Sequence, residues 1–497
     1  MRSFFRGGLL ALSVALIGLF AMTRSADAAG FGIAEQSVRA SGMNNAYSSL
    51  VDDPSAIYYN PGALGFLKGL QSSTGITIIR VRSRYDGYSG NDTDLRDRNA
   101  PVPYFYSSAE INDMFNVGIG VYAPYGTALS WPTQGETRYN NIRAQLRAQY
   151  ITPTIAFRPT DWISIGIGIS YVTTRRLLPH TGGKEGVRVH RAVDLVEPTF
   201  AGLRAQLPAS VPDSAVRQQA RAIASSVPEP MSRLKGNVDG WGYSFGVMAK
   251  PFDQLSLGLT YRGEVYLNGN GVSEFQGVQD PTGLPPGTFT NTLVRSHIRT
   301  SLVLPPSLAI AATVKPFNKL SVTAQADWTG WSTVDEIRIR FTNGKPRTVQ
   351  VLDLGWTDVW AYRVGVEYLV IGTYEDMKAN AEKRTKGSGD DETEGDEEES
   401  SAGGMVVAVR AGYLYDTSPI PNETVSAFLP DNDRNAYSVG VGFDMGFMAV
   451  DASVQYFHAR TIRRDAFSEG VDNEFHPNQG VFRTDAWLFG LGATLRF

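Results

Sequence analysis

Strict alternation between large apolar and small or polar side chains recurs along this chain. In "WISIGIGISYV", residues 162–172, isoleucine occupies every second position up to Tyr171, and glycine or serine fills the positions between. The segment "LSLGLTYR", residues 255–262, alternates in the same way. A period of two places the two residue types on opposite faces of a β-strand. The small, polar face fits either the water side of a soluble sheet or the lumen of a membrane barrel.

No segment after residue 28 contains 18 consecutive apolar residues, so we expect no helical membrane span there. A β-barrel remains possible, because only every second side chain of its strands meets lipid. The final segment, "AWLFGLGATLRF" at 486–497, also alternates and ends on Phe497. A last strand that ends in an aromatic residue resembles the terminal signal of bacterial outer-membrane barrels. We therefore expect the barrel-assembly machinery to recognise Phe497.

The first 28 residues have the parts of a secretory signal peptide. Arg2 and Arg6 precede the apolar run "GGLLALSVALIGLFAM", and the small-residue sequence Ala26-Asp27-Ala28 follows it. The alternative, an uncleaved anchor, would need about 20 apolar residues without this exit. We predict cleavage after residue 28. Cleavage leaves 43 basic and 49 acidic side chains, a balance that does not suggest nucleic acid as a partner, and the chain has no cysteine.

Three turns share a pattern in which proline precedes an Asp or Asn and an alternating strand restarts at once. They read "RPTDWISI" at 158–165, "KPFDQLSL" at 250–257 and "KPFNKLSV" at 315–322. Tight connections also lie at 111–115 and 443–447, whereas those at 177–237 and 269–293 are long. Short turns at one end and long loops at the other are typical of bacterial outer-membrane barrels.

This pattern predicts an all-β protein, a transmembrane antiparallel barrel of fourteen strands. We expect the strands near 70–84, 102–110, 115–124, 144–158, 162–176, 238–250, 255–268, 294–314, 319–341, 357–371, 405–416, 436–443, 447–463 and 485–497. The order of the strands places the acidic low-complexity insert at 371–404 in a periplasmic turn. Its run "GSGDDETEGDEEESSAGG", 387–404, could gather divalent cations or a basic partner, or it could be a solvated, disordered insert.

The segment "GFGIAEQSVRASGMNNAYSSLVDDPSAIYYNPGAL", 30–64, resembles the amino-terminal hatch of the FadL/TodX family of outer-membrane transporters for hydrophobic compounds. The residues that carry the resemblance are Phe31, Glu35-Gln36, Gly42, Ala46-Tyr47, Asp52-Asp53 and Asn60-Pro61. Further similar segments are "VGIGVYAPYG", "TPTIAFRPTDWISIGIG", "WGYSFGV", "ADWTGWS", "YDTSPIP" and "LPDNDR". The resemblance implies a signal peptide at 1–28, a hatch at 29–69 and a barrel at 70–497.

The resemblance also implies passive uptake of hydrophobic compounds, with long-chain fatty acids as the first candidate and aromatic hydrocarbons as the alternative. Phe31 matches a position that helps to form the family's ligand-binding pocket. Asn60, Pro61 and Gly62 match the hatch motif, in which the asparagine side chain bonds its own turn and proline fixes that turn. The family usually has alanine at the position of Gly62, so a looser hatch is conceivable.

A lateral exit through the wall is implied for the strand "FNVGIGVYAPYG", which contains Gly118 and Gly120. Glycine within a strand often marks a bend, but both glycines could instead simply leave room for the hatch. Outer-loop capture of substrate is the role implied for Phe200, Leu203, Val216 and Ile223, which lie on apolar helical stripes. The alternative is that these stripes pack on their own loop.

Two other classes of function compete with transport. An outer-membrane enzyme would need a nucleophile or metal motif, and none of the five histidines lies in one, so we expect no enzyme, cofactor or metal. A general porin or an adhesin would not need an amino-terminal hatch. The expected partners are therefore a hydrophobic small molecule, outer-membrane lipid and lipopolysaccharide, for a chain that acts as a monomer.

Overall fold

The computed structural model describes most of the chain beyond the first 29 residues. The described residues are 30–87, 92–96, 99–175, 183–189, 200, 203–204, 207–208, 210–226, 231–276, 295–342, 349–382, 404–422, 424–464 and 480–497. The predicted signal peptide and most of the acidic insert lie outside these residues.

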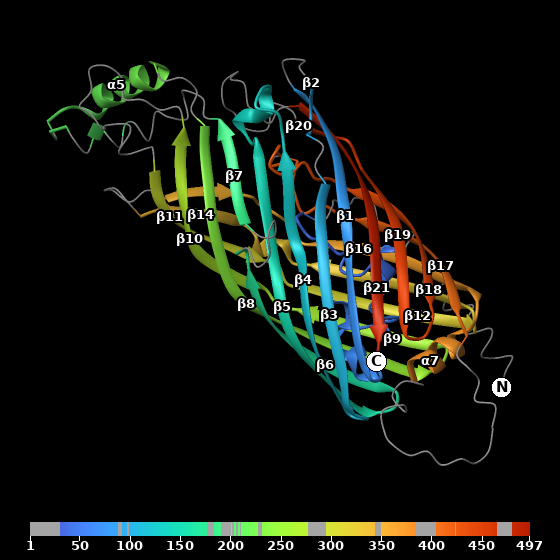
Figure 1. Cartoon of the computed structure of the whole chain (residues 1–497). Coiled ribbons are helices and arrows are strands. Elements are labelled where there is room, and N and C mark those ends of the chain that lie inside the picture. Colours follow the sequence, from blue (N-terminus) through green and yellow to red (C-terminus); the bar gives the residue numbers. More distant parts are fainter. Residues whose placement is uncertain are drawn as a thin grey trace, which may run out of the picture.

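The strands form one closed antiparallel barrel with fourteen wall positions, as predicted (Figure 1). Eleven positions are single strands: β1 (Leu70–Gly87), β3 (Asn99–Asn112), β4 (Phe115–Ser130), β5 (Arg143–Thr160), β6 (Ile163–Thr173), β8 (Met231–Phe252), β16 (Val359–Ile371), β17 (Val406–Asp416), β18 (Arg434–Asp444), β19 (Met448–Ala459) and β21 (Gly480–Arg496). The barrel closes where β1 pairs with β21, from Gln71 opposite Arg496 to Gly87 opposite Gly480.

The three remaining wall positions each consist of two strand segments. They are β9 (Leu255–Arg262) with β10 (Val265–Gln276), β12 (Ser307–Phe317) with β11 (Arg295–Leu304), and β13 (Leu320–Thr329) with β14 (Glu336–Phe341). The break between β11 and β12 falls at Pro305 and Pro306, which have no backbone N–H to give to a ladder. The sequence predicted one strand at each of these positions and missed the interruptions.

Four short strands lengthen the wall at the same end as the long connections. They are β2 (Asp92–Asp94), β7 (Gly183–Val189), β15 (Val349–Asp353) and β20 (Ile462–Arg464). Helix α5 (Asp213–Ser226) also lies at this end, whereas α7 (Tyr374–Glu382) lies at the end where the last strand finishes (Figure 1). Within the described residues, no helix is both long enough and apolar enough to cross a membrane.

The alternating pattern sets the two faces of the wall. On β6, Ile167 and Ile169 are 51% and 56% exposed on the outside, while Ser164 and Ser170 are buried on the lumen side. Small residues suit the lumen face because the amino-terminal segment of the chain fills the lumen. Residues 30–68 lie inside the barrel and include α2 (Val38–Ser41), α3 (Ala56–Tyr59) and the 3₁₀-helix η1 (Pro61–Phe66). We call residues 30–68 the hatch.

Candidate functional site

A cavity rich in tyrosine lies between the hatch and the wall. It encloses about 1120 Å³, part of it open to solvent, and we call it the tyrosine cavity. Its aromatic lining includes Tyr58 of α3, Tyr122 and Tyr125 of β4, Tyr150 of β5, and Trp331 of the short 3₁₀-helix η4 (Trp331–Thr333). The rings form a continuous series, with centroids 5.4 Å apart for Tyr58 and Tyr122 and 5.5 Å apart for Tyr122 and Tyr150.

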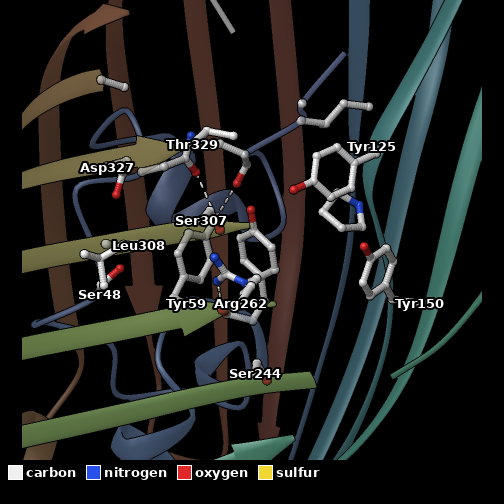
Figure 2. A pocket seen from close by; sticks show the side chains of 18 of the residues that line it. Ser48, Tyr59, Tyr125, Tyr150, Ser244, Arg262, Ser307, Leu308, Asp327 and Thr329 are labelled. Atoms are coloured by element: carbon white, nitrogen blue, oxygen red, sulfur yellow. Dashed lines mark hydrogen bonds between the residues drawn. The ribbon is translucent and has the colours of Figure 1, made fainter. Parts of the chain in front are cut away.

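The polar part of the tyrosine cavity carries charges that already have partners. The Arg262 guanidinium lies 4.2 Å from the centroid of the Tyr58 ring and donates to the Tyr58 carbonyl oxygen. Arg363 donates from Nε to Asp327 Oδ2 at 2.5 Å. Figure 2 shows Tyr125 and Tyr150 on one side of the view and Ser307 and Asp327 on the other. The cavity therefore offers ring faces and hydroxyl groups for binding, with its arginines engaged by the protein.

A second cavity, of about 1160 Å³ including open solvent, lies beside the first residues of the hatch. We call it the aliphatic cavity, because most of its lining consists of apolar side chains. They include Ile79 and Val81 of β1, Val102 of β3, Leu129 of β4, Leu146 of β5, and Phe457 of β19. One cation of this lining lacks a partner: Nη1 of Arg147 is buried and donates no hydrogen bond to any of the described residues.

The aliphatic cavity borders a place where the wall loses pairing. The ladder between β3 and β4 ends at Phe105 opposite Val121. Beyond that point β3 continues its pairing with β1, and β4 continues with β5 after a register shift between Tyr122 and Tyr125. The edge of β4 that faces β3 is therefore free of the β3 ladder above Val121.

The hatch supplies hydrogen bonds to this free edge of β4. Gln36 accepts from the Ala123 N–H and donates to the Ala123 carbonyl, both at 3.1 Å. The Ile33 N–H donates to the Pro124 carbonyl at 2.8 Å, and the Gly126 N–H donates to the Phe31 carbonyl at 2.9 Å. We call these four bonds the edge contact. They satisfy backbone groups that would otherwise lack partners inside the barrel.

Phe31, the predicted ligand-binding residue, lies in an aromatic cluster beside the tyrosine cavity. Its ring centroid is 4.9 Å from that of Trp331, 5.6 Å from Trp356 and 6.0 Å from Tyr125. Trp331 and Tyr125 line the tyrosine cavity, so Phe31 supports the lining from behind. Its role in ligand binding remains a prediction.

The hatch motif has the local geometry that its residue types suggest. Asn60 Oδ1 accepts from the Gly62 N–H at 3.0 Å, and Asn60 Nδ2 donates to the carbonyls of Ser48 and Val247, also at 3.0 Å. A Cβ atom on Gly62 would lie 2.8 Å from Gly246 O and Met248 N. This close approach to β8 is the opposite of the looser hatch that glycine suggested.

Gly118 and Gly120 lie below the free part of the β4 edge. Both are within the regular β3–β4 ladder, opposite Ser108 and Tyr106. A Cβ atom on Gly118 would lie 2.8 Å from Ile57 Cδ1, and one on Gly120 would lie 3.0 Å from Ile57 Cγ2. These distances favour the reading that the two glycines leave room for the hatch, and a part in lateral opening remains a prediction.

The residues predicted for outer-loop capture are packed within their own region. Leu203 is buried, as are Val216 and Ile223 of α5. Arg217 lies 4.4 Å from the centroid of the Phe200 ring. Their packing favours the alternative of a self-packed loop, and their role in capture remains a prediction. Among the described residues, no cluster of three or more histidine or acidic side chains is arranged to bind a metal ion.

Sequence reasoning missed the parts played by Gln36, Arg147, Arg262 and Trp331. Gln36 and Trp331 lie in segments that carried the family resemblance, but nothing in those segments assigns them to the edge contact or to a cavity. Arg147 lies within the predicted strand 144–158, and in the sequence it looks like any solvated arginine. Only the structure places it in the lining of the aliphatic cavity, opposite Gly126 of β4.

Comparisons with known proteins agree with this architecture. The family model described as "Outer membrane protein transport protein (OMPP1/FadL/TodX)" matches residues 19–375 and 405–497. The long-chain fatty acid transport protein of Escherichia coli strain K12 is 26% identical over 514 residues, which cover 100% of this chain and 99% of that protein. Outer membrane protein P1 of Haemophilus influenzae is 23% identical over 467 residues, with 88% and 87% of the two chains covered.

Solved structures show the same fold. A FadL homologue of Pseudomonas aeruginosa has a TM-score of 0.71 at 19% identity and covers 94% of this chain and 100% of its own. The toluene transporter TodX of P. putida has a TM-score of 0.61 at 13% identity, with 95% and 99% covered. The chain therefore belongs to the OMPP1/FadL/TodX family of outer membrane transport proteins, which confirms the predicted family and the predicted location in the bacterial outer membrane.

Proposed function

We propose that this chain takes up long-chain fatty acids passively, by binding them in the lumen and releasing them sideways through the wall. Family membership supports transport of a hydrophobic compound and a role that is not enzymatic. The fatty acid itself is favoured by one observation, the buried and unpartnered Arg147 Nη1 in a cavity whose lining is mostly apolar.

An amphiphile with a carboxylate head matches both parts of the aliphatic cavity. Each buried CH₂ group of an acyl chain contributes about 0.8 kcal/mol, and Ile79, Val102 and Leu146 provide an apolar surface for it. A guanidinium binds a carboxylate through two parallel hydrogen bonds, which would also satisfy the buried Nη1. A hydrocarbon would fill the apolar part and leave Arg147 unpartnered.

The exit route follows from the position of the cavity. Val102 of β3 and Gly126 of β4 both line it, and the β3–β4 ladder is missing between their strands at this level. A ligand that leaves here enters lipid directly and keeps its acyl chain out of water, which favours lateral release.

The test compares ligands with and without a carboxylate. The mature protein in mild detergent is titrated with palmitate, hexadecanol and an alkylbenzene, and bound ligand is detected by native mass spectrometry. We expect Arg147→Met to weaken palmitate at least 10-fold, about 1.4 kcal/mol, and to leave hexadecanol and the alkylbenzene unchanged. Arg147→Lys is the matched control and should keep most of the palmitate affinity. Equal binding of palmitate and hexadecanol by the parent would contradict the carboxylate assignment.

Uptake of aromatic hydrocarbons is the second candidate, and the tyrosine cavity favours it. Tyr122, Tyr150 and Trp331 offer ring faces and edges of the kind that bind other aromatic rings. In the same titration, alkylbenzene binding that exceeds palmitate binding and falls in Tyr150→Ala would support this candidate over the first. Phe31→Glu should weaken ligands of the tyrosine cavity, and unchanged binding would remove Phe31 from the site.

A further inference from the structure

Two arginines lie directly opposite each other on the outer face of the barrel. Arg299 of β11 pairs with Arg340 of β14, and both side chains are exposed. The neighbours of Arg299 along β11, Ile298 and Thr300, are buried on the inner side, so the alternation points Arg299 away from the lumen. Directly opposite side chains of adjacent strands have Cβ atoms about 5 Å apart.

The row continues across two further strands with neutral side chains. Asn270 of β10 is opposite Arg299, and Asn237 of β8 is opposite Asn270. Lys235 lies two residues further along β8, also exposed. We call Asn237, Asn270, Arg299 and Arg340, together with Lys235, the arginine row.

Carboxylates near the arginine row are engaged by other cations. Glu336 pairs with Arg338 at 2.5 Å, Glu274 with Arg295 at 3.9 Å, and Asp239 with Arg175 at 2.8 Å. Within the part of the chain that the structure describes, neither Arg299, Arg340 nor Lys235 forms an ion pair or a side-chain hydrogen bond. Like charges directly opposite in a ladder are destabilising, so an unneutralised pair at this place calls for an anion.

The position relative to the membrane identifies the kind of anion. Trp241 of β8 and Tyr266 of β10 are 68% and 59% exposed and belong to the aromatic belt that marks the membrane interface. Asn237 precedes Trp241 by four residues of β8, or about 13 Å along a tilted strand, and so lies nearer the end that carries α5. That end bears the long loops and faces the cell exterior. The arginine row is therefore at the level of lipid head groups in the outer leaflet.

We infer that the arginine row binds the phosphate groups of a phosphorylated glycolipid of the outer leaflet, lipopolysaccharide. Guanidinium groups bind phosphate oxygens through bidentate hydrogen bonds. The asparagine amides of Asn237 and Asn270 add donors for the sugar hydroxyls beside the phosphates. Bound glycolipid neutralises the Arg299–Arg340 repulsion and thereby ties β11 to β14 at the outer end of the wall.

The test uses the full mature protein, delipidated in mild detergent, with three probes: phosphorylated lipopolysaccharide, the same glycolipid after dephosphorylation, and inorganic phosphate. Arg299→Gln with Arg340→Gln should weaken the phosphorylated glycolipid at least 10-fold. The control is Arg84→Gln with Arg483→Gln, which removes the same charge from arginines that already pair with Asp86. It should change the affinity less than 2-fold. Equal binding of both glycolipid forms by the parent would overturn the inference, and displacement by an equal concentration of inorganic phosphate would overturn the lipid assignment.

Thermal melting provides a second readout that does not depend on titration. Without glycolipid, the Arg299→Gln, Arg340→Gln variant should melt above the parent, because the like-charge pair is gone. Added phosphorylated glycolipid should raise the melting temperature of the parent and leave that of the variant unchanged. A variant that melts below the parent in the absence of glycolipid, or that gains as much from glycolipid as the parent, would contradict the inference. Neither readout involves the lumen, so failure here leaves the proposed transport function untouched.

Discussion

Two of the regions in which the hatch contacts the barrel wall differ in their chemistry. One is the edge contact on β4, in which neutral backbone and amide groups bond. The other, which we call the charged contact, joins the hatch to β16, β17 and β19. There Arg39 donates to Asp52 at 2.6 Å and to Glu367 at 3.1 Å, and Arg410 donates to Glu367 and to Asp451, each at 2.6 Å.

The difference indicates which side of the hatch can separate from the wall. Removing one member of a buried ion network leaves a buried charge without a partner, which is far more costly than replacing a neutral hydrogen bond by water. Both proposed ligand cavities include residues of the hatch's first turn, Gly32 and Ile33, at the edge contact. We therefore expect a ligand to open the edge contact while the charged contact holds the hatch in place.

The largest effect is expected from breaking the charged contact. Glu367 is fully buried and lies between Arg39 and Arg410, so Glu367→Ala should destabilise the hatch by about 3–5 kcal/mol. Displacement of the hatch should appear as steady ionic current in planar bilayers, with the barrel still folded on unheated gels. Glu110→Ala is the control, because Glu110 pairs with the partly exposed Lys68 and should cost less than about 1 kcal/mol. If the Glu367 variant gave no ionic current in planar bilayers, the charged contact would not be what holds the hatch in place.

A smaller effect is expected where the hatch meets the wall through glycine. In Gly62→Ala, the added Cβ would press on backbone atoms of β8 at 2.8 Å, so we expect a loss of about 1–3 kcal/mol. The melting temperature in detergent measures this loss. Gly186→Ala of β7, where a Cβ meets no described atom within 4 Å, is the matched control and should leave the melting temperature nearly unchanged. Equal melting of both variants would show that the motif does not pack tightly.

Breaking the edge contact should affect ligand passage more than stability. Gln36→Leu removes both hydrogen bonds to Ala123. The backbone N–H and carbonyl of Ala123 must then bond to water, at a cost of about 1–2 kcal/mol in the free energy of unfolding. We expect faster ligand exchange in stopped-flow experiments and little ionic current. Gln71→Leu is the control: Gln71 bonds the Lys68 carbonyl at 2.9 Å, away from the edge contact. If Gln71→Leu accelerated ligand exchange as much as Gln36→Leu, the edge contact would not be the part of the hatch that controls ligand passage.

The smallest effect is a pH dependence at the start of the edge contact. The carboxyl of Asp431 accepts from the Gly30 N–H at 2.7 Å, and its burial raises its pKa to about 7, against the opposing effect of Arg434. The folded protein therefore binds a proton that the unfolded chain releases above pH 4, so stability should fall as pH rises from about 4 to about 7. Because the carboxyl is partly open to solvent, the change should be on the order of 1 kcal/mol. In Asp431→Asn, the melting temperature should change less with pH across this range. An unchanged slope of melting temperature against pH would show that Asp431 is not the titrating group.

Much of the fold was predictable because a barrel repeats a simple rule. The alternation at 162–172 and the three proline turns place strands and turns without reference to other parts of the chain, and all fourteen predicted strands are present. The breaks at 263–264 and 305–306 were missed, although the adjacent Pro305 and Pro306 carried the signal. The candidate site was harder to predict from the sequence. The family resemblance placed Phe31 near a pocket, whereas nothing in the sequence indicated the position of Arg147.

The sequence by itself determined which face each wall residue takes, because a period of two depends only on neighbours in the chain. It also determined the turn at Asn60, whose side chain bonds a backbone group two residues away. Only the tertiary structure decided that Arg39 meets Glu367, or that Arg299 meets Arg340. Those encounters depend on the register between strands and on how the closed wall wraps the hatch, and both are set by packing and pairing over the whole barrel.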